Sequence, residues 1–247
     1  AAPFFFAGDE VRFIDGRARL AAEPLALAHE AAWLRATGEL GADETLDVTP
    51  GGELLLVQRR NGYRFTADAL LLAEFAAAHG GEVLDVGTGC GVVGLLLLAR
   101  KKSSRVVAVE VQPALAALAR RNAELNGLTA HFEVVTADVR TEAFGGGRFA
   151  HIVANPPYFR VSEGRLSPDA ERAVARHEVA LTLEQLALSV AALLAPDGRL
   201  SVVLPSGRRD ECQALLALRG LAVVREERVA RRHLWLAEFA RGPARGP

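Results

Sequence analysis

Hydrophobic residues gather in short runs that alternate with longer stretches of helical spacing over most of the chain. The short runs predict strands at residues 83–86, 105–109, 131–136, 149–154 and 199–204. The longer stretches predict helices at residues 66–79, 92–100, 113–126, 182–194 and 207–218. Because strands alternate with helices, we expect an α/β fold in which helices cover both faces of a mostly parallel sheet. Residues 221–229 and 233–240 predict a closing antiparallel hairpin.

The first 50 residues follow a different pattern. A strand and turn are expected at residues 10–16, and an Ala/Leu-rich helical stretch at 20–40. After the break at Thr49-Pro50-Gly51-Gly52, a strand at 53–58 and a turn at 59–62 lead to the helix at 66–79, with Thr66 as its expected N-cap. We therefore expect an N-terminal extension, residues 1–50, and a main domain, residues 51–247.

Composition narrows the class of protein. Half of the 247 residues are hydrophobic and 24% are charged, which predicts a folded chain. With 29 basic and 30 acidic residues there is no overall basic field, so nucleic-acid binding requires a local basic patch. The two cysteines, Cys90 and Cys212, are too few for a disulfide framework or a four-thiolate zinc site, so we expect a cytoplasmic setting and no metal. No apolar run reaches the roughly 18 residues of a membrane span.

A glycine-rich loop, Asp85-Val86-Gly87-Thr88-Gly89-Cys90-Gly91, joins the strand at 83–86 to the following helix. Its glycines permit a tight turn and close approach of a ligand to the backbone. Residues 89–94 also match the dinucleotide fingerprint G-x-G-x-x-G, which is a weak signal by itself. Asp85 favours a different ligand, because a carboxylate two residues before Gly87 suits an ammonium group better than a pyrophosphate.

Acidic residues also end the next two predicted strands. Glu110 is placed to accept hydrogen bonds from both ribose hydroxyls of an adenosine, and Asp138 to accept one from the adenine amine. Val111 and Val139 follow these acids and are expected to lie on the two faces of the adenine ring. This ordered set resembles the class I S-adenosylmethionine-dependent methyltransferases, with a seven-stranded Rossmann-like sheet. The resemblance implies S-adenosyl-L-methionine as cofactor, bound by Asp85, Gly87, Thr88, Gly89, Gly91, Glu110, Val111, Asp138 and Val139.

The run Asn155-Pro156-Pro157-Tyr158 follows the fourth predicted strand and carries the expected catalytic chemistry. A planar amine is a poor nucleophile because its lone pair is delocalised. The Asn155 side-chain oxygen and the Pro156 carbonyl can accept its two N–H groups and aim the lone pair at the methyl group, while the prolines stiffen the loop. Tyr158 can stack on a flat acceptor such as a flipped base. No general base is required, since the proton can leave after transfer.

This motif resembles that of enzymes that methylate exocyclic amines or amides, so the acceptor stays open between adenine N6, guanine N2 in ribosomal RNA and glutamine N5 in protein. A non-enzymatic alternative is a donor-binding scaffold that has lost catalysis. The runs 58–73, 85–94, 155–159 and 175–178 together resemble the tRNA1(Val) (adenine-N6)-methyltransferase family.

That resemblance covers roughly residues 44–204 and implies methylation of the tRNA adenine just 3′ of the anticodon, adenine 37. It implies RNA, and specifically tRNA, as the partner and gives no oligomeric state. Phe65, Thr66 and Asp68 are expected to cover the methionine end of the cofactor, and Asn155 is also expected to contact the cofactor. Expected substrate contacts come from Tyr158, Phe159, Arg160, Arg172, Arg176 and His177. Arginines in the tail, residues 225–247, and at the 59–64 turn are candidate phosphate contacts; a solvated surface is the alternative for them.

Overall fold

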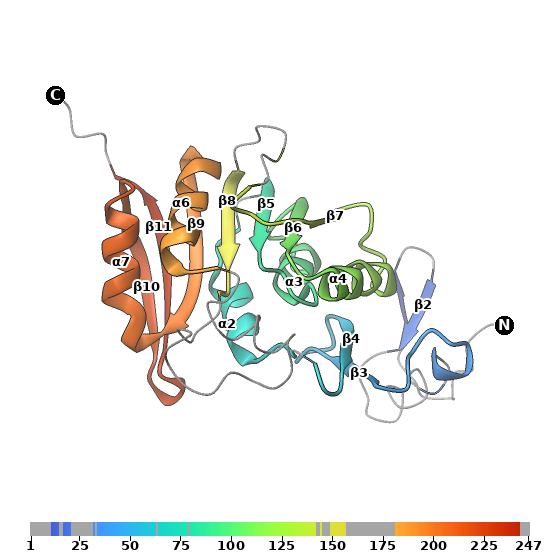
Figure 1. Ribbon diagram of the computed structural model, residues 1–247. Helices are drawn as coiled ribbons and strands as arrows, with labels where there is room; N and C mark the ends of the chain where they lie inside the picture. The colour runs from blue at the N-terminus through green and yellow to red at the C-terminus, as the bar shows by residue number, and fades with distance from the viewer. Residues whose placement is uncertain are drawn as a thin grey trace.

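The computed structural model describes residues 11–14, 17–20, 32, 34–62, 64–78, 80–141, 144, 149–156 and 181–242, with a seven-stranded sheet at its centre (Figure 1). In sequence order the strands of this sheet are β5 (Glu82–Val86), β6 (Arg105–Glu110), β7 (Phe132–Thr136), β8 (Phe149–Ala154), β9 (Leu194–Pro205), β10 (Leu221–Val229) and β11 (Leu234–Arg241). Their order across the sheet is β10-β11-β9-β8-β5-β6-β7.

The strand directions confirm the predicted α/β fold. Among β5 to β9 every neighbouring pair is parallel, and β11 pairs antiparallel with both β9 and β10. From β5 the chain winds outward through β6 and β7 on one side, and then returns to β8 on the other. The order reverses between β5 and β8, which is where such sheets leave a crevice for ligands.

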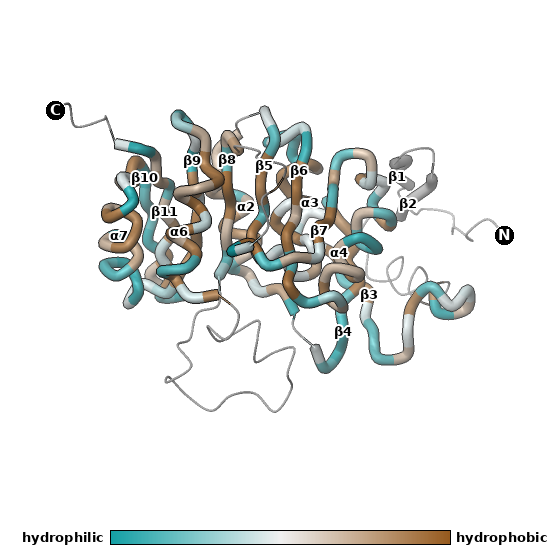
Figure 2. Tube along the Cα trace, turned by 45° about the horizontal axis from the view of Figure 1, so that its top comes forward, coloured by the Kyte–Doolittle hydropathy of each residue, from teal (hydrophilic) through white to brown (hydrophobic). Residues whose placement is uncertain are grey.

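Two groups of helices cover the two faces of this sheet. Helices α2 (Ala67–Phe75), α3 (Val92–Ala99) and α4 (Pro113–Leu125) share one hydrophobic core with one face. Helices α6 (Leu183–Leu193) and α7 (Arg209–Ala217) share a second core with the other face. Figure 2 shows the central strands as predominantly hydrophobic, while α7 alternates between hydrophilic and hydrophobic residues. Apolar runs buried on both faces are typical of parallel sheets.

Local chemistry sets where the helices begin and end. Thr182 and Gln185 form a reciprocal capping box at the start of α6. Thr66 is the N-cap residue of α2, as predicted, but its side chain makes no capping hydrogen bond. The predicted helix at 66–79 ends early, at Phe75. Lys102 accounts for this end, because its ammonium group donates to the carbonyl oxygens of Ala73, Glu74 and Ala76 at 2.5 to 3.0 Å.

Two short hairpins precede the sheet, one formed by β1 (Val11–Ile14) and β2 (Arg17–Leu20) and the other by β3 (Glu44–Val48) and β4 (Leu55–Arg59). β3 was not predicted, because its sequence, Glu-Thr-Leu-Asp-Val, is mostly polar. The β3–β4 hairpin spans residue 50, and the division of the chain at that residue stays a prediction. Most of the predicted helix at 20–40 lies outside the described residues.

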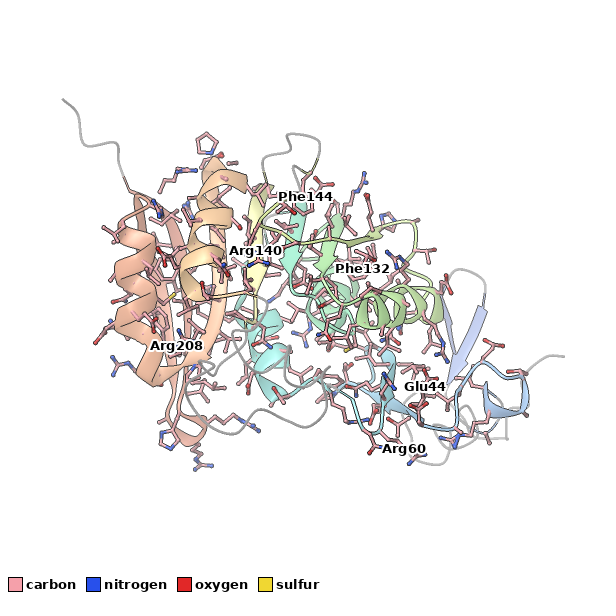
Figure 3. All side chains as sticks on the ribbon, in the orientation of Figure 1. Glu44, Arg60, Phe132, Arg140, Phe144 and Arg208 are labelled. Atoms are coloured by element: carbon pink, nitrogen blue, oxygen red, sulfur yellow. The ribbon has the colours of Figure 1, made fainter. Side chains whose placement is uncertain are left out.

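The second edge of β4 is paired by side chains instead of by a strand. Asn126 accepts from the Leu55 N–H at 3.0 Å and donates to the Leu55 carbonyl oxygen at 2.7 Å. One helical turn earlier, Asn122 makes the same pair of bonds with Val57, at 2.8 and 3.1 Å. These two buried amides satisfy backbone groups of β4 that would otherwise be buried without partners. They fasten the hairpin to α4, and Figure 3 shows Glu44 of the hairpin close to that helix.

The strand predicted at 199–204 begins earlier than expected, at Leu194. Residues 195–198, which separate the predicted helix from the predicted strand, lie inside β9 as a bulge. Leu194 pairs with Phe149 and Arg199 pairs with His151, so β9 contributes more residues than β8 over this interval. Short 3₁₀ turns, η2 (Ser206–Arg208) and η3 (Ala230–Arg232), follow β9 and β10.

Candidate active site

The carboxyl ends of β5, β6 and β8 lie side by side at the switch point of the sheet. Val86 of β5 pairs with Val109 of β6 on one side and with Ala154 of β8 on the other. The residues at and directly after these strand ends therefore converge at one edge. They are the glycine loop, Glu110 and Asn155, which lie at three separate positions in the sequence.

The glycine loop takes a backbone conformation that explains its composition. Gly87, Gly89 and Gly91 all have positive φ angles, of 70°, 58° and 91°, which side chains with a Cβ rarely adopt. A Cβ on Gly87 would meet no atom within 4 Å, so the loop borders open space there. Gly87 and Thr88 both donate backbone hydrogen bonds to the Val109 carbonyl oxygen, at 2.9 and 3.0 Å. The loop is thus held against β6, and it borders open space at Gly87.

Asp85 lies in β5, just before the glycines of this loop, and is 2% exposed. Its Oδ2 accepts from the Thr88 hydroxyl at 2.7 Å and from the Gly94 N–H at 3.1 Å. Its Oδ1 has no hydrogen-bond partner in the part of the chain that the structure describes. Burial raises the pKa of Asp85 to about 6; the Thr88 and Gly94 hydrogen bonds oppose this shift, and the charge of Glu110 adds to it. An ammonium group beside Oδ1 would favour the ionised form.

Glu110, the last residue of β6, is 5% exposed and links two loops. Its Oε2 accepts from the Gly89 N–H at 3.0 Å, and its Oε1 accepts from the Gln112 N–H at 2.9 Å. A carboxylate oxygen can accept more than one hydrogen bond. The two oxygens are therefore fixed in position and keep further capacity for a pair of hydroxyls such as those of a ribose.

Asp138, expected at the adenine amine, forms an ion pair with Arg140. The Arg140 Nε donates to both carboxylate oxygens at 2.8 and 2.9 Å, and its backbone N–H donates to Oδ1 at 2.9 Å. These hydrogen bonds hold the pKa of Asp138 below its ordinary value. Sequence analysis did not foresee this partner, although an Arg two residues after a strand-end Asp is a visible signal. Val111 is 43% exposed and Val139 is 8% exposed, so Val111 lies at the surface while Val139 is buried, and their placement on the two faces of an adenine ring stays a prediction.

Asn155 and Pro156 come directly after β8, and Pro156 is buried while Asn155 is partly exposed. Through the pairing of Ala154 with Val86, they adjoin the start of the glycine loop. Their roles as acceptors for a substrate amine stay predictions. The remaining expected substrate residues, Pro157, Tyr158, Phe159, Arg160, Arg172, Arg176 and His177, lie outside the described residues.

A polar network fixes the segment that precedes α2. Gln58 is 2% exposed, and its Oε1 accepts from the Phe65 N–H at 2.9 Å. Asp47 of β3 accepts from Gln58 Nε2 at 3.0 Å and from Arg64 at 2.8 Å. The strand that carries Gln58 is joined to the glycine loop by Asn122, which donates to the carbonyl oxygens of both Val57 and Cys90. Phe65 packs partly buried against the core. The segment is therefore anchored beside the loop.

Thr66 and Asp68 lie within that anchored segment. Thr66 is exposed and Asp68 is partly exposed at the start of α2. The helix N-terminus favours a negative charge such as that of Asp68. Coverage of the methionine end of a cofactor by Phe65, Thr66 and Asp68 stays a prediction.

One supporting residue of the loop was missed by the sequence analysis. Asn122 of α4 donates to the Cys90 carbonyl oxygen at 2.9 Å, in addition to its two bonds with Val57. Since Asn122 is fully buried, it joins the glycine loop to the β3–β4 hairpin from inside the protein. The available signal was a pair of asparagines, Asn122 and Asn126, spaced by one turn on the buried face of a helix.

The sequence of this chain is similar to those of known methyltransferases. Residues 64–218 match the model of the methyltransferase small domain. The chain is 34% identical over 163 residues to a tRNA1(Val) (adenine(37)-N6)-methyltransferase of Porphyromonas gingivalis, covering 62% of this chain and 63% of that protein. It is 32% identical over 174 residues to the protein of that name from Tolumonas auensis, covering 70% and 72%. The chain thus spans slightly less than two thirds of the Porphyromonas relative.

Solved structures support the same fold. The ribosomal protein L11 methylase of Lactobacillus delbrueckii subsp. bulgaricus aligns with a TM-score of 0.52 and 22% identity, over 71% of this chain and 78% of that one. This likeness concerns the arrangement of the sheet and helices. In the described part of the chain, no helix is long and apolar enough to cross a membrane.

Proposed function

Since the chain belongs to the methyltransferase small domain family and, within it, to the tRNA1(Val) (adenine(37)-N6)-methyltransferase family, we propose that it transfers a methyl group from S-adenosylmethionine to N6 of an adenine in tRNA. The proposed acceptor is adenine 37, next to the anticodon, as the name of the relatives states. A cytoplasmic setting is part of the same proposal.

One observation carries this proposal. Two buried carboxylates, Asp85 and Glu110, lie at the same edge of the sheet as the Asn155-Pro156 segment. Carboxylates can recognise the ammonium group and the ribose hydroxyls of a nucleoside that carries an amino acid. The Asn155-Pro156 segment presents amide and carbonyl acceptors, of a kind that recognises an amine. Their adjacency supports a reaction between a nucleoside-like donor and an amine acceptor.

The residues present fit the proposed cofactor. The Asp85 Oδ1 and the open space beside Gly87 suit an amino-acid end with its ammonium group. The fixed oxygens of Glu110 suit the two ribose hydroxyls. Asp138, with its charge balanced by Arg140, suits a hydrogen bond from the adenine amine. S-adenosylmethionine, when bound, supplies an electrophilic methyl group on its sulfonium.

The acceptor side of the reaction depends on Asn155 and Pro156. The Asn155 side-chain oxygen and the Pro156 carbonyl accept the two N–H groups of the adenine amine. These bonds draw the nitrogen away from planarity and direct its lone pair. Proline restricts the backbone, so the acceptors are aligned before the substrate arrives. Catalysis then comes mainly from orientation, and the proton leaves to solvent after the new C–N bond has formed.

The test is transfer of labelled methyl from S-adenosylmethionine to total tRNA that lacks this modification, followed by nucleoside analysis. We expect N6-methyladenosine with the wild-type protein. We expect the Asn155→Ala variant to lose transfer by about 100-fold or more, with the dissociation constant of the donor nearly unchanged, because the lost interaction serves the acceptor. Asn61→Ala, at an exposed turn, is the matched control and keeps full activity.

Other outcomes identify the alternatives. Transfer to ribosomal RNA that yields N2-methylguanosine, or to a protein glutamine, replaces the tRNA assignment. Donor binding without transfer to any macromolecule indicates a scaffold that has lost catalysis. Loss of donor binding in Asn155→Ala contradicts the role assigned to that residue.

A further inference from the structure

Three arginines form an exposed basic group where β10 turns into β11. Arg228 lies near the end of β10, and Arg231 and Arg232 lie in η3. All three are exposed, and we call them the basic tip. Within the residues that the structure describes, none of the three forms an ion pair. An exposed cluster of this kind is the local basic patch that a chain of net charge −1 needs for binding a polyanion.

Two charged residues of β10 that precede the basic tip, Arg225 and Glu226, form ion pairs with other residues. Glu226 accepts two hydrogen bonds from Arg209 of α7 and one from the Trp235 indole, at 2.8 to 3.1 Å. Arg225 donates to Glu238 at 3.1 Å and lies over the Phe75 ring, 4.0 Å from its centre. Glu226 and Arg225, which precede the basic tip along β10, are therefore paired with residues of α7 and β11.

One acid remains exposed beside the basic tip. Glu227 is adjacent to Arg228 in β10, and because side chains alternate along a strand it points to the opposite side. The basic tip thus keeps an excess of positive charge on its own side.

The basic tip lies at the same edge of the sheet as Asn155. Leu234, which begins β11 directly after the turn, pairs with Pro205 at the end of β9. β9 in turn runs parallel to β8, and its Val202 pairs with Ala154. The turn therefore extends beyond the carboxyl ends of β8 and β9. In Figure 1 this hairpin reaches the lower edge of the molecule, toward which β8 also points.

The backbone of the turn is held in place. The His233 N–H donates to the Ala230 carbonyl oxygen at 3.2 Å, and the Ser206 N–H donates to the His233 carbonyl oxygen at 2.8 Å. The second bond connects the turn to η2, which follows β9. Since the arginines stand on an ordered turn, binding through them orders little additional backbone.

We propose that the basic tip binds backbone phosphates of the RNA substrate while the acceptor adenine lies at Asn155. This inference rests on the proposed function. Guanidinium groups bind phosphates through paired N–H donors and read no sequence. The basic tip therefore increases affinity for tRNA as a whole, and the choice of adenine remains with the Asn155 segment.

The experiment compares two variants that remove the same net charge. Arg231→Gln with Arg232→Gln removes two charges at the basic tip, while Lys101→Gln with Arg219→Gln removes two exposed charges near the amino ends of β6 and β10. KM for tRNA, kcat, the dissociation constant of S-adenosylmethionine and the salt dependence of tRNA binding are measured for both and for wild type. Adding Arg228→Gln to the first variant then extends the series.

At the basic tip we expect KM for tRNA to rise about three- to tenfold, and the slope of log K against log salt to fall by about 0.7 to 0.9 for each phosphate that the variant no longer binds. We expect kcat at saturating tRNA and donor binding to stay unchanged, and the control variant to match wild type throughout. Arg228→Gln should increase the effect.

Equal KM and salt slope in the basic-tip variant and wild type overturn the inference while leaving the proposed function intact. Equal losses in the two variants also overturn it, because they indicate overall charge alone. If the wild-type protein neither binds nor methylates RNA, the proposed function fails first and this inference falls with it. Weakened binding of polyglutamate, with tRNA binding unchanged, overturns the choice of RNA as the partner.

Discussion

The Glu110 Oε2 lies 3.0 Å from the Gly89 backbone nitrogen and accepts its hydrogen bond. Because Oε1 accepts from the Gln112 N–H, one carboxylate ties together the loops that follow β5 and β6. The glycine loop of the candidate active site is therefore positioned by the same side chain that we propose for ribose recognition. Cofactor binding and loop geometry should respond together when Glu110 is changed.

We expect Glu110→Gln to weaken S-adenosylmethionine binding at least about tenfold, measured by isothermal titration calorimetry. The amide keeps one oxygen, but its NH₂ group faces a backbone N–H donor, and hydrogen bonds to a charged acceptor contribute about 1.5–3 kcal/mol. Glu133→Gln is the matched control, because Glu133 is an exposed residue of β7 that pairs with Arg105. Equal affinities in the two variants would argue against a role for Glu110 in the site.

We expect the affinity for S-adenosylmethionine to fall as the pH drops below about 6, by up to about tenfold per pH unit. Burial raises the pKa of Asp85 from 3.8 to about 6, and an ammonium group requires the ionised carboxylate. Calorimetric titrations across this pH range measure the effect. Asp85→Asn should bind weakly at every pH and lose this dependence. A wild-type affinity that does not change across the range would contradict the assignment.

The same group affects folding in the opposite sense. Because the pKa of Asp85 is higher in the folded chain than the ordinary value, its contribution to stability is fully present below pH 3.8 and is lost as pH rises through about 6. In the absence of ligand, denaturant titrations should therefore show Asp85→Asn gaining stability relative to wild type between these pH values and above them. The ionised Asp85 carboxylate that the cofactor requires at neutral pH therefore lowers the stability of the ligand-free protein. A stability difference that is the same at all pH values would contradict this prediction.

We expect Asn122→Ala to lower the free energy of unfolding by about 2–3 kcal/mol, measured by denaturant titration. The truncation removes the partners of the Val57 N–H and carbonyl and of the Cys90 carbonyl, all linked to this one buried amide. Asn61→Ala, at an exposed turn, should stay within about 0.5 kcal/mol of wild type. A loss confined to cofactor binding, without any loss of stability, would mean that Asn122 does not support the hairpin.

We expect Gly94→Ala to destabilise the fold by about 1–3 kcal/mol despite its position inside α3. An added Cβ would lie 2.8 Å from both Phe132 Cε2 and Val106 Cγ1, and 3.1 Å from Asp85 Oδ2. The close approach of α3 to the sheet leaves no room for a methyl group. Gly207→Ala is the matched control, because a Cβ there meets no atom within 4 Å. Thermal unfolding of the two variants provides the comparison, and equal melting temperatures would contradict the close packing.

The sequence was informative where a local rule decides the structure. Apolar runs such as those in β5 and β6 belong to buried parallel strands, and the turn that Gly87, Gly89 and Gly91 form requires positive φ angles. The order of the acidic residues along the chain predicted which strand ends would matter. Strand β3 escaped prediction because Leu46 is its only buried residue, so its hydrophobic signal is weak.

By itself the sequence determined the alternation of strands and helices and the conformation of the glycine loop. It also determined the candidate residues for binding the methyl donor and the acceptor amine. Each of these depends on residues that lie near one another in the chain. Tertiary structure alone decided the bonds of Asn122 to Val57 and Cys90, 65 and 32 positions away, and the place of the basic tip beyond β8 and β9. The bonds of Asn122 follow from the packing of the β3–β4 hairpin and the glycine loop against α4, and the place of the basic tip follows from the order of the strands in the sheet. A hydrogen bond across such separations depends on the packing of whole elements, which no local pattern of residues encodes.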